Sequence, residues 1–225
     1  MADGRPHPAW PIAERTERER RDWDQMAARY DRGTVLERFL IGDTRGRLCG
    51  QALGRTLEVA AGTGLNLEFY PDEVDLTAID FSRGMLDVAG SRATRLDRSV
   101  TVVQGDAQRL PFVDASFDTV VCTLALCAVQ DQTAAVAEMR RVMRPGALLL
   151  LVDHIEYTRI PMRWVEGRRT RRDAPRRRPL DIVVETGFTV EQHDRLAFGF
   201  VDRVVARRPR LSPSAEPGAG PSATA

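Results

Sequence analysis

The chain has 225 residues, a formal net charge of +1 and 43% hydrophobic residues. This length suits one domain with a full hydrophobic core, and the near-neutral charge gives no support to binding of polyanions through overall charge. The three cysteines (Cys49, Cys122 and Cys127) are odd in number and lack the spacing of metal or redox motifs. The first residues are charged, unlike a signal peptide. We therefore expect a reduced, cytoplasmic protein.

The hydrophobic pattern alternates between helical and strand periods along most of the chain. The compositions of residues 1–13 and 209–225 are typical of a flexible N-terminus and a disordered tail, so the expected domain is 14–208. Helices are predicted at 14–31, 34–52, 82–94, 131–143 and 178–187. Strands are predicted at 55–60, 75–80, 99–103, 117–123, 147–153, 188–197 and 200–207.

Continuous apolar strands, such as ALLLLVD at 147–153, alternate with amphipathic helices. This alternation predicts a parallel sheet that is covered by helices on both faces. Only Phe198 and Gly199 separate the last two strands, which indicates an antiparallel hairpin at one edge of the sheet. The expected fold class is α/β, a doubly wound, mostly parallel seven-stranded sheet of the Rossmann-like kind with an antiparallel C-terminal edge hairpin.

The stretch RTLEVAAGTGLNLEFYP, residues 55–71, carries a carboxylate, Glu58, inside an apolar strand and then turns through Gly62-Thr63-Gly64. Glycines permit positive φ and remove the Cβ that would keep a ligand away from the backbone. In a doubly wound sheet, ligands bind at the carboxyl ends of the strands. A simple turn would also explain one Gly-x-Gly pair, so the interpretation as a ligand-binding loop depends on further residues.

Two further acids follow the next strands. Asp80 ends the second strand, where an acid can accept hydrogen bonds from both hydroxyls of a ribose. Asp106 follows the third strand, where its carboxylate can accept from an adenine amino group while the backbone N–H of Ala107 donates to the ring. Three acids after successive strands fit an adenosine-containing ligand.

The competing ligand is a nicotinamide dinucleotide, whose fingerprint needs a third glycine for the pyrophosphate. Leu67 stands at that position. A cofactor with adenosine and no phosphates, S-adenosylmethionine (SAM), fits better. Glu58 would then help to bind the cationic amino-acid end of SAM, directly or through water.

From about residue 20 to residue 207, the chain resembles the class I SAM-dependent methyltransferases. LEVAAGTG is similar to the family's first motif, although Ala60 replaces its first glycine. AIDFSRGML resembles the second motif, and GDAQRLPFVDASFDTVVCTLALCAV the third and fourth. EMRRVMRPGALLLLVDH resembles the segment before and within the fifth strand, with Arg144-Pro145-Gly146 as a turn. MAARYD, with Tyr30 and Asp31, resembles the helix that closes over the methionine end.

The resemblance implies SAM as the cofactor and a set of cofactor-binding residues. They are Tyr30, Glu58, Ala60, Gly62, Gly64, Asn66, Asp80, Phe81, Met85, Asp106, Ala107 and Thr123. The subfamilies it most resembles are the methyltransferase-like thiol S-methyltransferases and the related bacterial phospholipid and quinone methyltransferases. The Asn/Asp-Pro-Pro-aromatic signature of enzymes that methylate nucleic-acid bases is missing, so no nucleic acid is expected as a partner.

His154, at the end of the fifth strand, is the candidate catalytic base, and a structural histidine is the alternative. Asp153 either orients His154 or faces solvent. Trp23 is either a lid residue or part of a helix core. Tyr157 and Trp164 are candidates for the acceptor pocket. No metal ligands are expected.

The expected function is methyl transfer from SAM to a small-molecule acceptor (a thiol, hydroxyl or amine), as in secondary metabolism. One alternative is N-methylation of a phospholipid headgroup, in which the seven arginines of 168–178 contact an anionic membrane. The other interpretations of this arginine-rich segment are a mobile, solvated insertion and contact with an anionic ligand or a nucleic acid. A SAM-binding protein without catalysis is the third functional alternative.

Overall fold

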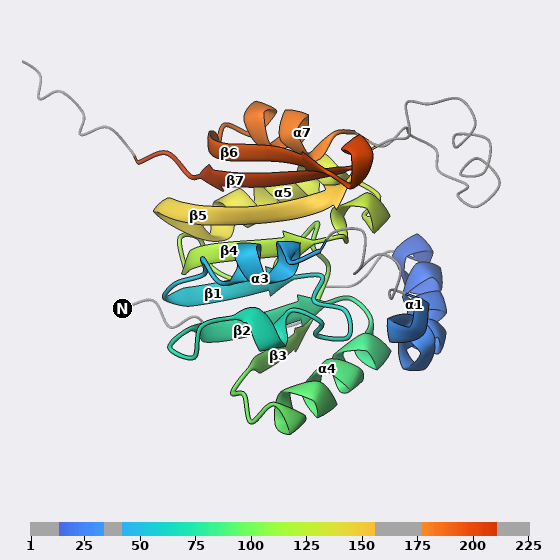
Figure 1. Cartoon of the computed structure of the whole chain (residues 1–225). Coiled ribbons are helices and arrows are strands. Elements are labelled where there is room, and N and C mark those ends of the chain that lie inside the picture. Colours follow the sequence, from blue (N-terminus) through green and yellow to red (C-terminus); the bar gives the residue numbers. More distant parts are fainter. Residues whose placement is uncertain (1–13, 34–41, 156–176, 211–225) are drawn as a thin grey trace, which may run out of the picture.

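The structure, a computed structural model, describes residues 14–33, 42–155 and 177–210 (Figure 1). The strands of this part form one seven-stranded sheet in the order β3-β2-β1-β4-β5-β7-β6. Their bounds are β1 Arg55–Val59, β2 Asp75–Asp80, β3 Thr101–Gln104, β4 Phe117–Thr123, β5 Met143–His154, β6 Thr189–Leu196 and β7 Val201–Arg207.

The first five strands are parallel, and β7 lies antiparallel to both β5 and β6. The predicted fold class and its C-terminal edge hairpin are therefore confirmed. β1 pairs with β2 on one side and with β4 on the other, so the strand order reverses next to β1. In sheets of this kind the reversal opens a crevice at the carboxyl ends of the strands, which is where ligands bind.

Four of the five predicted helices agree with the structure to within two residues at each end. Their bounds are α1 Glu14–Gly33, α3 Thr44–Cys49, α4 Arg83–Arg95, α5 Gln132–Val142 and α7 Pro179–Glu185, with short 3₁₀ turns η1 Leu67–Phe69, η2 Leu126–Ala128 and η3 Ala197–Gly199. Two caps fix the starts of α4 and α5. The Ser82 hydroxyl accepts from the Met85 N–H, and the Asp131 carboxylate accepts from the Ala134 N–H. In the described residues, none of the helices has the length and apolar character that crossing a membrane requires.

The sheet is buried on both faces, which explains the continuous apolar strands. Along β5, Leu149 and Leu151 pack into a cluster with α5 and α7, whereas Leu150 and Val152 pack into a second cluster with α3. All four side chains are fully buried. Helix α1 lies beyond the strand ends instead of over a sheet face (Figure 1).

Two predictions about local structure need correction. Within the predicted helix at 34–52, the described residues are helical only over Thr44–Cys49, because the chain turns at Gly50; residues 34–41 lie outside the described part. Arg144-Pro145-Gly146 is not a turn before the fifth strand. It lies inside β5 as a bulge, where the register with β4 shifts and Gly146 has a φ of +86°.

Candidate active site

A cavity lies at the carboxyl ends of the central strands and has about 760 Å³ of empty space, part of it open to solvent. It is formed by the loops after β1, β2, β3 and β4, together with α1. Its lining is mostly apolar with a few polar groups, as in typical small-molecule sites. The residues that line it are Trp23, Tyr30, Ala60, Gly62, Ile79, Asp80, Phe81, Met85, Gly105, Asp106, Ala107, Gln108, Leu124, Ala125, Ala128, Val129 and Gln130.

Asp80 connects two of these loops. Its Oδ2 accepts a hydrogen bond from the backbone N–H of Gly62 at 2.9 Å, and its Oδ1 accepts from the N–H of Ser82 at 2.9 Å. Burial raises the pKa of the Asp80 carboxyl to about 6, while these backbone hydrogen bonds act in the opposite direction. Each oxygen retains a second lone pair, so the carboxylate can still accept from a ligand hydroxyl.

The three small residues of the loop after β1 have different structural roles. A Cβ at Gly62, where φ is +56°, would meet no atom within 4 Å, so this backbone faces open space in the cavity. A Cβ at Gly64 would lie 2.8 Å from Cδ1 of Leu67, so that glycine is required by packing. Ala60 has a φ of +54°, a conformation that glycine adopts more readily. The first glycine of the motif is thus replaced at a position that still has the left-handed backbone.

On the third strand's side, Asp106 and Ala107 line the cavity as the sequence predicted. The Asp106 Oδ1 accepts from the backbone N–H of Gln108 at 2.8 Å, and the Gln108 side-chain amide lies 3.1 Å from both carboxylate oxygens. These hydrogen bonds fix the carboxylate at the edge of a slot that Ile79, Phe81 and Met85 make apolar. A flat heteroaromatic ring with an amino group suits such a slot.

Helix α1 contributes Trp23 and Tyr30 to the cavity, and their rings pack edge to face with centroids 5.8 Å apart. Asp24 fixes the helix to the start of α4, because it accepts from the Ser82 hydroxyl at 2.6 Å and the Gly84 N–H at 2.8 Å. Asp31 accepts from the Thr63 hydroxyl at 2.6 Å and pairs with Arg92. The helix therefore covers the cavity through contacts with two of its loops.

Four residues of the predicted cofactor set lie outside the cavity lining: Glu58, Gly64, Asn66 and Thr123. Glu58, Asn66 and Thr123 form a buried network, in which the Asn66 amide donates to Glu58 Oε1 and to the Thr123 hydroxyl, both at 2.8 Å. The sequence did not single out its fourth member, Arg45. The Arg45 guanidinium donates to Asn66 Oδ1 at 2.6 Å and to the Thr123 hydroxyl at 3.2 Å.

Burial raises the pKa of Glu58 to about 7, against the effects of the Asn66 hydrogen bond and the positive charge of Arg45. The network joins α3, β1 and β4 directly beneath the glycine loop. Glu58 is therefore buried next to the loop and does not line the cavity.

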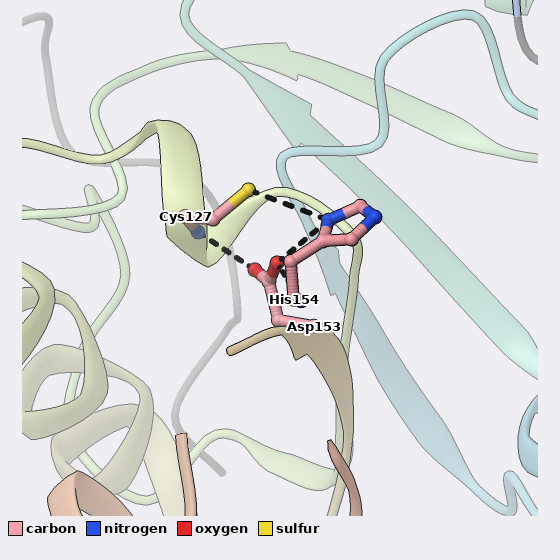
Figure 2. A group of neighbouring side chains, drawn as sticks. All are labelled: Cys127, Asp153 and His154. Atoms are coloured by element: carbon pink, nitrogen blue, oxygen red, sulfur yellow. Dashed lines mark hydrogen bonds and ion pairs between the residues drawn. The ribbon is translucent and has the colours of Figure 1, made fainter. Parts of the chain in front are cut away.

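The predicted catalytic residue, His154, does not line the cavity. It lies at the end of β5 beside Cys127 of η2, whose neighbour Ala128 does line it. Figure 2 shows the Nδ1 edge of the His154 ring facing Cys127 and the fully buried Asp153, with the Nε2 edge pointing away from both. Asp153 does not face solvent. Its oxygens accept from the backbone N–H groups of Cys127 at 2.7 Å and of His154 at 2.5 Å.

The structure thus brings eight of the twelve predicted cofactor-binding residues to one cavity: Tyr30, Ala60, Gly62, Asp80, Phe81, Met85, Asp106 and Ala107. Trp23 joins them as a cavity residue. Arg45 and Asp24 were missed because one arginine of 33 and one acid of an amphipathic helix carry no local signal. Tyr157 and Trp164 lie outside the described residues, as do residues 168–176 of the arginine-rich segment.

Comparisons with known proteins agree with this geometry. Residues 57–151 match the family model described as a methyltransferase domain. Among solved structures, a SAM-dependent methyltransferase from Aquifex aeolicus superposes with a TM-score of 0.62 at 18% identity, covering 81% of this chain and 98% of that one. The [4+2]-cyclase SpnF has the same fold, with a TM-score of 0.63 at 17% identity over 94% of this chain and 88% of its own. The fold alone therefore does not fix the reaction.

Curated relatives are more similar in sequence. A demethylmenaquinone methyltransferase of Renibacterium salmoninarum is 40% identical over 152 residues, which is 64% of this chain and 61% of that protein. A phosphatidylethanolamine N-methyltransferase of Cereibacter sphaeroides is 39% identical over 115 residues, 50% of this chain and 57% of that protein. A thiol S-methyltransferase of Homo sapiens is 34% identical over 124 residues, 53% of this chain and 50% of that protein.

The chain thus spans between half and about three fifths of the length of these curated relatives. The matched region contains β1 to β4 and most of β5, and with them the glycine loop, Asp80 and Asp106. Residues 57–151 are therefore similar to a methyltransferase domain, and the chain shares its fold with the solved SAM-dependent methyltransferase described above.

Proposed function

We propose that the protein is a SAM-dependent methyltransferase that methylates a small-molecule acceptor. The observation that carries the proposal is the convergence of Gly62, Asp80 and Asp106 on one cavity at the reversal of strand order. The cavity also offers an open backbone at Gly62 and an apolar slot beside two carboxylates. These features match the chemistry of an adenosine that lacks phosphates.

The donor set of the cavity supports SAM over a dinucleotide. The described residues that line it include no arginine, although arginine is the most abundant charged residue type of the chain. A pyrophosphate would need cationic side chains or a third loop glycine, and this site has neither. Asp80 is placed to accept from ribose hydroxyls, Asp106 from an amino group on the ring, and Gly62 to let the ligand approach the backbone.

When bound, SAM would supply an electrophilic methyl group on a sulfonium. The acceptor attacks this methyl in line. Most of the protein's contribution to the rate would therefore come from orienting the acceptor and the methyl group. The apolar residues Leu124, Ala125 and Val129 exclude water from the reacting atoms, and Trp23 with Tyr30 covers the opening. Exclusion of water favours a reaction in which the charge on sulfur is lost.

We propose His154 as the group that takes the acceptor's proton, with Asp153 beneath it as the residue that orients the ring. The His154 side chain is 27% exposed, so an acceptor can reach it, whereas the Asp153 side chain is 1% exposed. Thiols ionise near neutral pH without help, while hydroxyls and amines benefit from such a base. Thiol, hydroxyl and amine acceptors, including those of secondary metabolism, are the proposed class.

A second candidate function is N-methylation of a phospholipid headgroup, which one relative's name favours. Of the arginines in 168–178, the two that the structure describes have acidic partners. Arg177 pairs with Glu185, and Arg178 lies 3.7 Å from Asp202. These two arginines are therefore less available to a lipid surface. A cytoplasmic location, proposed from the cysteine usage of the sequence, is compatible with either function.

The test is a binding measurement followed by a turnover screen. Titration calorimetry should show binding of SAM and of its demethylated product, and no binding of NADH. Methyl-labelled SAM should then label one of a panel of thiols, phenols and amines in preference to phosphatidylethanolamine vesicles. Binding of NADH without SAM would refute the cofactor assignment. SAM binding with no labelling of any acceptor would favour the non-catalytic alternative.

A further inference from the structure

We propose that Cys127, Asp153 and His154 form a binding site for one zinc ion next to the cavity, where Cys127 adjoins the cavity residue Ala128. The three side chains offer a thiolate sulfur, a carboxylate oxygen and an imidazole nitrogen, and these atoms all lie within 4.8 Å of one another. Figure 2 shows the Cys127 sulfur and the Asp153 carboxylate both facing Nδ1 of His154, between η2 and the end of β5. Sulfur, nitrogen and oxygen ligands together are a set that zinc accepts readily.

The separation of the imidazole and the carboxylate suits metal ligands better than a hydrogen bond, whereas the separation of the thiol and the imidazole fits either a long hydrogen bond to sulfur or a pair of metal ligands. The Cys127 Sγ lies 3.8 Å from His154 Nδ1, and Nδ1 lies 3.5 Å from Asp153 Oδ1. An imidazole-to-carboxylate hydrogen bond would be shorter, at about 2.7–3.2 Å. Two ligands of a tetrahedral zinc, at about 2.0–2.3 Å from the ion, are about 3.4–3.6 Å apart. Both observed distances lie within about 0.2 Å of that range.

The thiol and the carboxylate are the pair that must approach each other, by about 1 Å at most. Cys127 is only partly buried, so rotation of its side chain can supply this movement. The carboxylate itself is fixed, since its two oxygens accept backbone N–H groups from Cys127 and His154. Hydrogen bonds of this kind hold a metal-ligating side chain in its orientation before the ion binds.

The charge around Asp153 also favours a cation. Asp153 lies directly across from Asp202 of β7 in the sheet, and both are 0% exposed. Asp202 has arginine partners, with Arg195 at 3.5 Å and Arg178 at 3.7 Å. Across residues 14–33, 42–155 and 177–210, no arginine pairs with Asp153, whose one ionisable partner is His154. A divalent ion would offset the cost of removing this buried carboxylate from water.

The neighbouring pair His193–Asp202 provides an internal comparison. Its nitrogen and oxygen are 3.1 Å apart, which is an ordinary hydrogen bond, and no cysteine of the described residues is grouped with it. The two histidine–aspartate pairs thus differ in distance, in arginine neighbours and in the presence of a thiol. Zinc is expected at the first pair and not at the second.

Three protein ligands leave one tetrahedral position for an exogenous ligand, as in catalytic zinc sites. This role, unlike binding of the ion, rests on the proposed function: an acceptor thiol or hydroxyl would lose its proton to solvent on binding there. Its anion then forms the new bond to the methyl carbon while the sulfonium carbon–sulfur bond breaks. If zinc is bound to Nδ1 of His154, the ion activates the acceptor in place of the imidazole.

The test measures zinc itself on the full-length protein. After loading and dialysis, the wild type should retain one equivalent of zinc, and Cys127→Ser and His154→Ala should each weaken zinc binding by about 100-fold or more. His193→Ala is the matched control and should retain the equivalent. Cobalt in place of zinc should give a thiolate-to-metal charge-transfer band that Cys127→Ser abolishes. Melting temperature and SAM affinity, measured on the metal-free form of each variant, should be unchanged and so exclude misfolding.

Retention of less than about half an equivalent of zinc by the wild type would overturn the proposal, as would equal retention by Cys127→Ser and the wild type. Cobalt binding without the thiolate band would also overturn it, because Cys127 would then not be a ligand. SAM calorimetry on metal-free protein keeps the two proposals separable. Failure to bind zinc leaves SAM binding intact, and failure to bind SAM leaves the zinc measurement valid.

Discussion

The Asp80 carboxylate accepts a hydrogen bond from the backbone N–H of Gly62 at 2.9 Å. The acid at the tip of β2 thus fixes the glycine loop at the tip of β1, in addition to any contact with a ligand. Since the second oxygen accepts from Ser82, the same carboxylate also fixes the chain just before α4. Loop shape and ligand binding therefore depend on one buried side chain.

Replacement of Asp80 should separate these two effects. The substitution Asp80→Asn keeps one carbonyl oxygen as acceptor but removes the charge, so we expect SAM to bind about 10-fold more weakly. Asp80→Ala removes both oxygens and should weaken SAM binding by about 100-fold. Calorimetry gives both values. Asp87→Asn, at an exposed acid of α4 that pairs with Arg83, is the control and should leave affinity unchanged. Unchanged affinity in Asp80→Ala would refute the ribose assignment.

Ala60 adopts a left-handed backbone with φ of +54°, which costs a residue with a Cβ about 1 kcal/mol. Ala60→Gly removes this strain, so it should raise the free energy of unfolding by up to about 1 kcal/mol. Urea denaturation checks the value. Ala78→Gly, at a buried position of β2 with ordinary strand geometry, should lower stability. Equal destabilisation by both substitutions would show that Ala60 carries no strain.

The raised pKa of Glu58 gives a dependence of stability on pH. The pKa is about 7 in the folded protein, compared with 4.5 for an exposed glutamate. Between these values the folded state retains a proton that the unfolded state has released, so stability must fall as pH rises from 4.5 to 7 and then level off. Glu58→Gln has the same shape and does not titrate. Its stability relative to wild type should increase over this window, by about 3 kcal/mol at most.

Chemical denaturation at several pH values measures this difference. Glu191→Gln is a surface control, because its partner Arg207 lowers the pKa of Glu191 from 4.5. Its effect on stability therefore changes only below pH 4.5, and its difference from wild type should stay constant above that pH. A constant difference between wild type and Glu58→Gln from about pH 4.5 to about pH 8 would show that Glu58 is ionised throughout.

The sequence predicted the sheet and most helix starts because these signals are local. Buried strands need unbroken apolar runs, and the caps Ser82 and Asp131 stand next to the first helical turn. Pro145-Gly146 has the residue types of a turn for the same reason, although hydrogen bonds with Arg208, just after β7, keep it inside β5 as a bulge. Sequence patterns show which residue types stand at the ends of the strands, so the cavity residues at these ends could be predicted.

Contacts between distant segments leave no such pattern. Arg45 meets Asn66 and Thr123 across separations of 21 and 78 residues, and only the folded chain brings them together. The grouping of Cys127 with Asp153 and His154 is of the same kind, since a spacing of 27 residues is not a metal motif. For Glu58, the sequence predicted a contact with the cationic end of SAM, directly or through water, but not the buried network that surrounds this acid.

His154 is the residue on which the proposed reaction and the proposed zinc site meet. We expect His154→Ala to lower turnover by about 100-fold while SAM affinity stays within about 2-fold of wild type, because the ring lies outside the cavity lining. The effect should be larger with a hydroxyl or amine acceptor than with a thiol, whose anion forms unaided. His193→Ala, which removes a histidine bonded to Asp202, should retain turnover.

Steady-state kinetics on metal-free and zinc-loaded protein distinguish the two roles of His154. If the imidazole is the base, metal-free wild type is active and its rate rises with pH as the ring loses its proton. If the ion activates the acceptor, zinc restores turnover to metal-free wild type but not to His154→Ala or Cys127→Ser. Full activity of His154→Ala in both preparations would exclude both roles, and His154 would then serve only to position η2 against the end of β5.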